Sequence, residues 1–270
     1  MPRSLLHLFP FTLFALLAAC GGSSSNGVIG TVPGTGTGAT AQVQGIWTGS
    51  LTVTGNPSTP ILAPIIQDGL AFFFDKNGVI YVLPAFTGAS SMNGTLLAIA
   101  PAGVTFPNGQ SQESFSVTVT VTSSATGTTP VQTISGSFTG NGETGTFTLT
   151  PTQPFAGTPS IVAGNWQGFE LGTGSPAVAL TVQSGGVFVG NDANGCNLNG
   201  TISQLQSGQN LFSVTVTSTG SSSLCLGQMK GLAFESTSDF SGLFGGAIGT
   251  YYYLTVTNAS GGFVAEVKVQ

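Results

Sequence analysis

The strongest constraint on the fold is a strict alternation of apolar and hydroxyl-bearing residues in short runs. In the clearest run, residues 115–122, Phe or Val alternates with Ser or Thr. Side chains two residues apart share one face of a β-strand, so this run predicts a strand with one buried and one exposed face. Similar runs cover residues 51–54, 146–150, 211–217 and 251–257. No stretch has the three- and four-residue apolar spacing of an amphipathic helix, so we expect an all-β protein.

Tight turns are indicated between these runs by Asn-Gly pairs. Asn and Gly tolerate the positive φ angles that two-residue hairpin turns require. The pairs stand at residues 77–78, 93–94, 141–142, 194–195 and 199–200.

An internal repeat organises the chain. The motif G-x-W-x-G occurs at residues 45–49 and 164–168 and contains both Trp residues, Trp47 and Trp166. Four further matches follow in the same order: residues 75–78 with 192–195, 93–95 with 199–201, 115–120 with 212–217, and 145–147 with 249–251. The repeat predicts two homologous domains, residues 43–155 and 160–270, with Trp47 and Trp166 in their cores.

Each domain is predicted to be a small antiparallel β-barrel or sandwich. About 110 residues with short strands and frequent turns suit these architectures. Closure into a barrel removes exposed strand edges, which matters in a chain with only 5% charged residues.

The G-x-W-x-G strand resembles the first strand of calycin barrels, the lipocalin and avidin group. The resemblance implies that the Trp closes one barrel end and that a Gly allows close strand packing. The chain departs from the lipocalin pattern because it has no Arg after Arg3.

The N-terminus carries a predicted signal peptide, residues 1–19. A positive residue, Arg3, precedes an apolar stretch of the length expected for secretion. Residues 17–20, Leu-Ala-Ala-Cys, resemble the lipobox of bacterial lipoproteins, which implies cleavage before Cys20 and its lipidation with fatty acids such as palmitate. The alternative is an ordinary secretory signal with a chance Cys. Gly21 after the Cys implies, by resemblance to Gram-negative lipoproteins, an outer-membrane location.

A flexible linker is predicted over residues 20–42, beginning at the lipidated Cys. The segment is rich in Gly, Ser and Thr and lacks apolar periodicity. Single acyl chains bind membranes reversibly, so a stable anchor needs two or more.

The two remaining cysteines, Cys196 and Cys225, are predicted to form a disulfide in an oxidising compartment. Two unpaired buried thiols are the alternative. The pattern around them, residues 192–233, resembles a group of proteobacterial lipoproteins, which implies no particular activity.

Composition argues against several functional classes. Three Lys and no Arg or His follow Cys20, so nucleic-acid binding lacks cations and His-based catalysis lacks its base. No metal or cofactor motif is present. The close carboxylate pairs are Asp68 with Asp75 and Glu235 with Asp239; we interpret them as solvated turn residues rather than glycosidase pairs.

Two aromatic triplets, residues 72–74 and 251–253, place rings on both faces of a strand. Either the outer rings bind a partner, or the other domain covers them. The sequence therefore favours a membrane-anchored, non-enzymatic binding or structural module of the cell envelope, with an unknown protein, glycan or small apolar ligand as partner. The alternative is a calycin-like carrier of an apolar small molecule.

Overall fold

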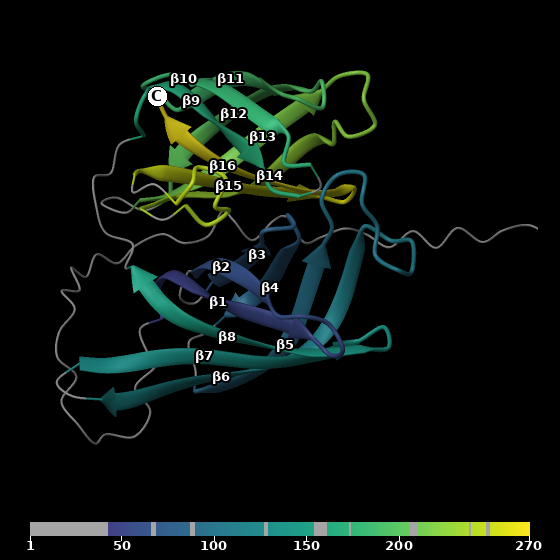
Figure 1. Ribbon diagram of the computed structural model, residues 1–270, viewed down its shortest axis with the longest axis vertical. Helices are drawn as coiled ribbons and strands as arrows, with labels where there is room; N and C mark the ends of the chain where they lie inside the picture. Colours follow the sequence, from purple (N-terminus) through teal and green to yellow (C-terminus); the bar gives the residue numbers. More distant parts are fainter. Residues whose placement is uncertain are drawn as a thin grey trace, which may run out of the picture. The chain divides into compact units, whose positions relative to one another are not determined.

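The computed structural model describes residues 43–65, 69–86, 90–126, 129–153, 161–172, 174–205, 210–237, 239–246 and 249–270. All of them belong to one compact unit of the chain. These residues contain strands and turns and no helix, and they form two closed antiparallel barrels of eight strands each (Figure 1). The prediction of an all-β protein with two tandem barrels is confirmed.

The first barrel is a simple meander in which each strand pairs with the next and β8 pairs with β1. Its strands are β1 (Gly45–Val53), β2 (Thr59–Ile65), β3 (Gly69–Asp75), β4 (Ile80–Phe86), β5 (Ser91–Ile99), β6 (Gln112–Thr126), β7 (Thr129–Gly140) and β8 (Glu143–Gln153).

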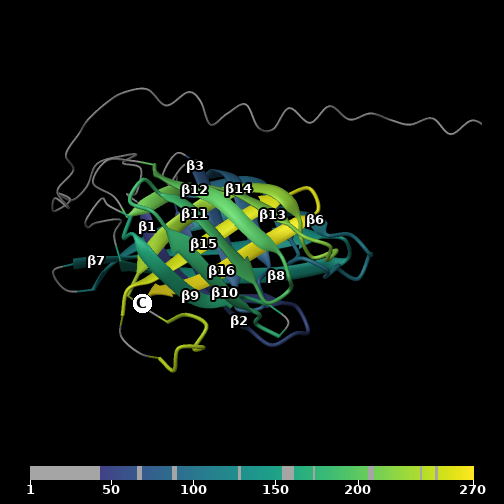
Figure 2. The ribbon, with the colours of Figure 1, turned by 90° about the horizontal axis from the view of Figure 1, so that it is seen from above.

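The second barrel repeats this topology, and Figure 2 shows its strands crossing at an angle around the barrel wall. Its strands are β9 (Gly164–Glu170), β10 (Ala177–Val182), β11 (Val187–Asp192), β12 (Asn197–Gln204), β13 (Leu211–Thr219), β14 (Gly227–Ser236), β15 (Tyr251–Asn258) and β16 (Gly261–Val269).

The two Trp residues occupy equivalent places in the barrels. Trp47 is 2% exposed and its indole N–H donates to the carbonyl oxygen of Val43 at 2.8 Å. Trp166 is fully buried and makes the same bond, four residues back, to Val162 at 2.9 Å. This shared local geometry identifies β1 and β9 as equivalent strands.

Glycine allows each barrel to close. A Cβ on Gly49 would collide with the carbonyl oxygen of Thr148 across the β1–β8 seam. A Cβ on Gly168 would collide with the carbonyl oxygen of Glu266 across β9–β16. The last Gly of each G-x-W-x-G motif is therefore required by a close approach of two strands.

Side chains fill the interior of each barrel. The inward-facing positions of β1–β8 form one cluster that includes Trp47, Phe73, Phe115, Phe138 and Phe147. A second cluster fills the other barrel, where the rings of Trp166 and Tyr252 stack with centroids 4.2 Å apart.

The internal repeat is confirmed at the level of the two barrels, but three of its five sequence matches join strands that are not equivalent. Phe115 lies in the sixth strand of the first barrel, whereas Phe212 lies in the fifth strand of the second. The pairs 93–95 with 199–201 and 145–147 with 249–251 are displaced by one strand in the same way. Alternation of Val and Thr suits any half-buried strand, so it does not define which strand is matched.

Two of the five predicted Asn-Gly turns are wrong, because residues 93–94 lie within β5 and residues 199–200 within β12. Gly200 lies beneath the ring of Phe188, where a Cβ would collide with it. The other three pairs do form turns; at Asn141 and Gly142 both φ angles are positive, at 51° and 81°.

The aromatic triplets are covered on both faces. Phe73 and Tyr252 point into their own barrels, whereas Phe72, Phe74, Tyr251 and Tyr253 join a third cluster with residues from both barrels. The ring of Phe74 lies 5.8 Å from that of Tyr253. A backbone bond from Gly262 N–H to the Ala100 carbonyl, 2.9 Å long, supports the same contact. Of the two alternatives for these rings, packing against the other barrel is correct.

Candidate functional site

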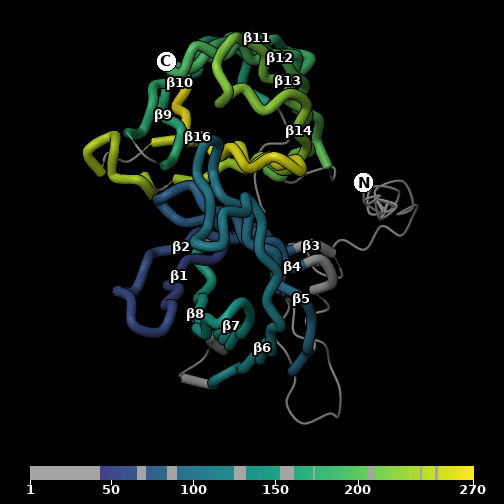
Figure 3. The backbone as a smooth tube through the Cα atoms, turned by 90° about the vertical axis from the view of Figure 1, so that its right-hand side faces the viewer, coloured from purple at the N-terminus to yellow at the C-terminus, as the bar shows by residue number. Residues whose placement is uncertain are grey.

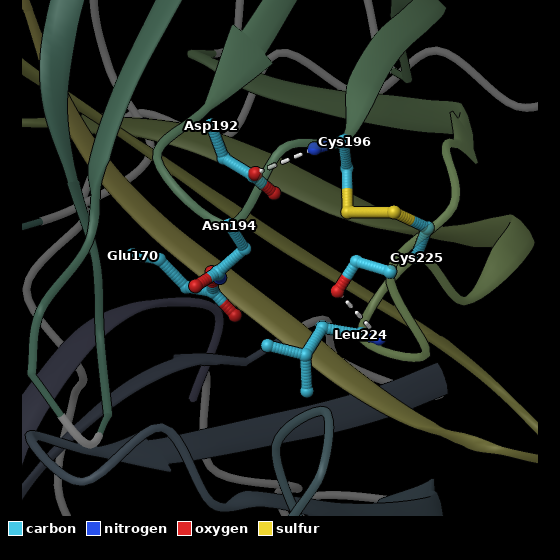
Figure 4. The surroundings of a disulfide bond; sticks show 7 residues. Glu170, Asp192, Asn194, Cys196, Leu224 and Cys225 are labelled. Atoms are coloured by element: carbon cyan, nitrogen blue, oxygen red, sulfur yellow. Dashed lines mark hydrogen bonds between the residues drawn. A yellow bond between two sulfur atoms is a disulfide. The ribbon is translucent and has the colours of Figure 1, made fainter.

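The disulfide between Cys196 and Cys225 is present, with Cα atoms 5.5 Å apart (Figure 4). It links the start of β12 to the loop before β14. The other site residue expected from the sequence, Cys20, lies outside the described residues, as do the predicted signal peptide and linker.

A carboxylate-capped turn holds Cys196 in place. The Asp192 carboxylate accepts a hydrogen bond from the Cys196 backbone N–H at 3.0 Å. In the first barrel, Asp75 accepts from Val79 N–H at the same distance. The two Asp-x-Asn-Gly turns are therefore equivalent, with the disulfide-forming Cys196 in the place of Val79.

Beside this turn lies Glu170, which the sequence reasoning did not single out. Glu170 is 6% exposed, and Figure 4 shows its side chain and that of Asn194 pointing toward each other. The Asn194 amide donates to the Glu170 carboxylate at 3.0 Å. Burial raises the pKa of Glu170 to about 7; the negative charge of Asp192 adds to the increase, and the bond from Asn194 opposes it. The equivalent position in the first barrel is Leu51.

A second buried carboxylate, Glu266, fastens a loop. Its oxygens accept from the Tyr253 hydroxyl at 2.7 Å and from the backbone N–H groups of Phe240 and Ser241. Burial raises the pKa of Glu266. In the same loop Asp239 accepts from the N–H groups of Gly242, Phe244 and Gly246. These carboxylates have structural partners.

The carboxylates that form close pairs in the sequence are Asp68 with Asp75 and Glu235 with Asp239. Asp75 is 4% exposed and caps its own turn, which contradicts its interpretation as a solvated residue. The Glu235 carboxylate accepts a hydrogen bond from the Tyr252 hydroxyl at 3.4 Å. Asp68 lies outside the described residues.

Within the described ranges, no three His, Cys, Asp or Glu side chains gather as metal ligands. The same ranges hold no helix long and apolar enough to cross a membrane.

The outer face of β5–β8 in the first barrel is covered by hydroxyl and amide side chains in regular rows. Strand pairing places one row across four strands as Thr95, Ser116, Thr139 and Thr144. The next row is Asn93, Thr118, Ser137 and Thr146, and a third is Ser91, Thr120, Ser135 and Thr148. None of these side chains is charged. The neighbouring strands can be followed in Figure 3.

A trough of about 650 Å³ runs across the strands between the first two rows. Its walls carry the side chains of both rows other than that of Thr95, together with Thr54 at one end. Its floor is the backbone of the row that points inward: Gly94, Val117, Phe138 and Gly145. Adjacent strands lie roughly 4.8 Å apart, so the four strands give the trough a length of about 14 Å.

Several hydroxyl groups along the trough have no protein partner. Within the part of the chain that the structure describes, the side chains of Ser116, Ser137, Thr139 and Thr146 are exposed and make no hydrogen bond to another protein group. Thr118 instead donates to the Asn93 side chain at 2.7 Å, and the Thr54 and Thr144 hydroxyls are bonded at 2.8 Å. The trough thus offers both free donors and free acceptors.

The second barrel presents a different surface. The outward-facing side chains of β14 and β15 are buried against the first barrel, as Leu232 and Tyr253 illustrate. On β11 the outer face carries Val187 and Val189, which are 44% and 49% exposed. On β12 and β13 Thr201 pairs with Thr215, but this row continues into Val187 on one side and Lys230 on the other. Its hydroxyls therefore do not extend across four strands as they do on the first barrel.

The alternating Ser and Thr residues on these strands were visible in the sequence, but the trough was not. Its walls form only when the strand register aligns residues of four strands. Comparison of the chain with known proteins finds no matching family model, no matching curated protein and no matching solved structure.

Proposed function

We propose that this protein is a lipid-anchored, non-enzymatic binding module of the bacterial cell envelope, located at the outer membrane. The lipobox-like residues 17–20 and the Gly/Ser/Thr-rich residues 20–42 support the anchor and tether. A flexible tether of about 22 residues has a mean span of roughly 25 Å, which would carry the barrels beyond the lipid headgroups.

The observation that carries the binding role is the uncharged trough on the outer face of β5–β8. Its volume of about 650 Å³ is within the usual range of ligand sites. Exposed hydroxyls without protein partners line both of its walls. The carboxylates of Glu266 and Asp239, by contrast, already accept several hydrogen bonds from the protein, and this supports binding rather than catalysis.

The filled interiors favour this role over transport of an apolar molecule inside a barrel. A carrier barrel needs space for its ligand. Here the interior positions hold large side chains, including Trp47, Phe73 and Phe147 in the first barrel and Phe212 in the second. We therefore place the binding surface outside the barrel wall.

The anchor is tested by fractionation of cells that express the full chain. We expect the wild type in the outer-membrane fraction, and Cys20→Ser in a soluble or inner-membrane fraction without incorporated palmitate. A Cys20→Ser variant that remained in the outer membrane with palmitate attached would contradict lipidation at Cys20.

The binding role is tested by cosedimentation of residues 21–270 with isolated cell envelopes. Thr146→Lys places a long charged side chain on one wall of the trough and should strongly reduce sedimentation. Thr201→Lys is the matched control, because Thr201 is an exposed strand residue on the outer face of the second barrel. Equal sedimentation of the two variants would contradict a binding role for the trough.

A further inference from the structure

We infer that the trough between the two hydroxyl rows binds a segment of a neutral glycan chain. This inference rests on the proposed binding role and specifies the ligand class of the same site. It is carried by the chemistry of the walls, by the lack of charge and by the shape of the trough.

The walls match the hydrogen-bonding capacity of a sugar chain. Each hydroxyl of a Ser or Thr can donate one hydrogen bond and accept two, and sugar hydroxyls have the same dual capacity. Free hydroxyls face each other across the floor, with Ser116 and Thr139 on one wall and Ser137 and Thr146 on the other. An extended chain in the trough would therefore meet donors and acceptors on both sides.

The charge of the trough argues against anionic ligands. No Lys or Arg lines it, whereas phosphate, sulfate and carboxylate groups are recognised mainly by cationic side chains and clustered backbone N–H groups. The chain also has nine acidic residues against four basic ones. A neutral ligand needs no cationic partner, and the net negative charge of the chain does not repel it.

The closed barrel argues against an extended peptide. Peptides commonly add to a free sheet edge or bury apolar side chains in a groove. Within the described residues each strand of the first barrel pairs with both of its neighbours, although β4 and β5 pair over only three residues. The polar groups of the trough walls are all hydroxyl or amide groups. Its length of about 14 Å, from strand spacing, is suited to a short stretch of a longer polymer.

The test is an NMR titration of isotope-labelled residues 21–270 with cellotetraose, maltohexaose and laminarihexaose. We expect at least one of these neutral sugars to shift amide signals of β5–β8 around the trough. The double variant Thr139→Val and Thr146→Val removes one free hydroxyl from each wall while keeping the side-chain shape. Loss of two hydrogen bonds should weaken binding by about thirty-fold, and Thr201→Val should leave it unchanged.

Several results would overturn the inference. These are no binding by any of the sugars, signal shifts confined to the second barrel, unchanged affinity in the double variant, or stronger binding of an uncharged Gly-Ser peptide of similar length. If residues 21–270 cosediment with envelopes through the trough but bind none of these sugars, the glycan inference fails while the binding role stands.

Discussion

Replacement of Glu170 by Gln tests the electrostatics of the turn beside the disulfide. The pKa of Glu170 is raised from 4.5 to about 7, chiefly by burial. The folded protein therefore holds this proton more tightly than the unfolded chain does. The free energy of unfolding falls as pH rises from about 4.5 to about 7, because the buried carboxylate must ionise, and it stays lower above that range.

The expected magnitude follows from the size of the shift. One pKa unit corresponds to about 1.4 kcal/mol, so ionisation of Glu170 lowers the free energy of unfolding by about 3 kcal/mol at pH 8. Glu170→Gln removes this term, and the Gln side-chain oxygen can still accept the bond from Asn194. The variant should match the wild type near pH 4 and exceed it by about 3 kcal/mol at pH 8.

The assay is urea unfolding of both proteins from pH 4 to pH 8, with each comparison made at one pH so that other titrating groups cancel. Asn194→Ala provides a variant of opposite sign, because it removes the hydrogen bond that stabilises the carboxylate, and should extend the loss of stability to higher pH. A stability difference between Glu170→Gln and the wild type that stays constant over this pH range would refute the reasoning.

Three further predictions concern stability. Cys196→Ser breaks a disulfide that spans 29 residues and should lower the free energy of unfolding by about 3–4 kcal/mol, whereas an unchanged urea midpoint would show that the bond does not form. Phe74→Ala should cost about 3–5 kcal/mol, because its ring contacts Phe234 and Tyr253 between the barrels, and calorimetry should then show separate transitions; a small cost with one transition contradicts this. Gly49→Ala should destabilise by more than about 1 kcal/mol and speed amide exchange along β1 and β8, and unaltered exchange would disprove the close approach.

The barrels could be predicted from the sequence because their signals are local. Alternation along residues 115–122 reports one buried face, and the G-x-W-x-G motif marks a position with specific contacts, the bond from Trp47 to Val43 among them. The Asp-x-Asn-Gly turns also matched correctly, since a carboxylate cap such as Asp75 requires a fixed local sequence.

Strand equivalence and the surface features could not be predicted in the same way. Phe115 and Phe212 stand in identical local sequences but in the sixth and fifth strands of their barrels, because the same alternation suits any half-buried strand. The burial of Glu170 depends on a turn 24 residues away. The trough depends on the register of β5–β8, which no single segment encodes.

The most direct test of the binding role is maleimide labelling of Ser137→Cys in the full, lipid-anchored chain. Cys196 and Cys225 are paired in the disulfide, so the introduced thiol is distinguishable, and Thr201→Cys reports the second barrel. We predict that Ser137→Cys is protected in intact envelopes and reacts freely after purification, while Thr201→Cys reacts in both. Equal reactivity of Ser137→Cys in envelopes and in solution would contradict the proposal that this trough is occupied in the cell.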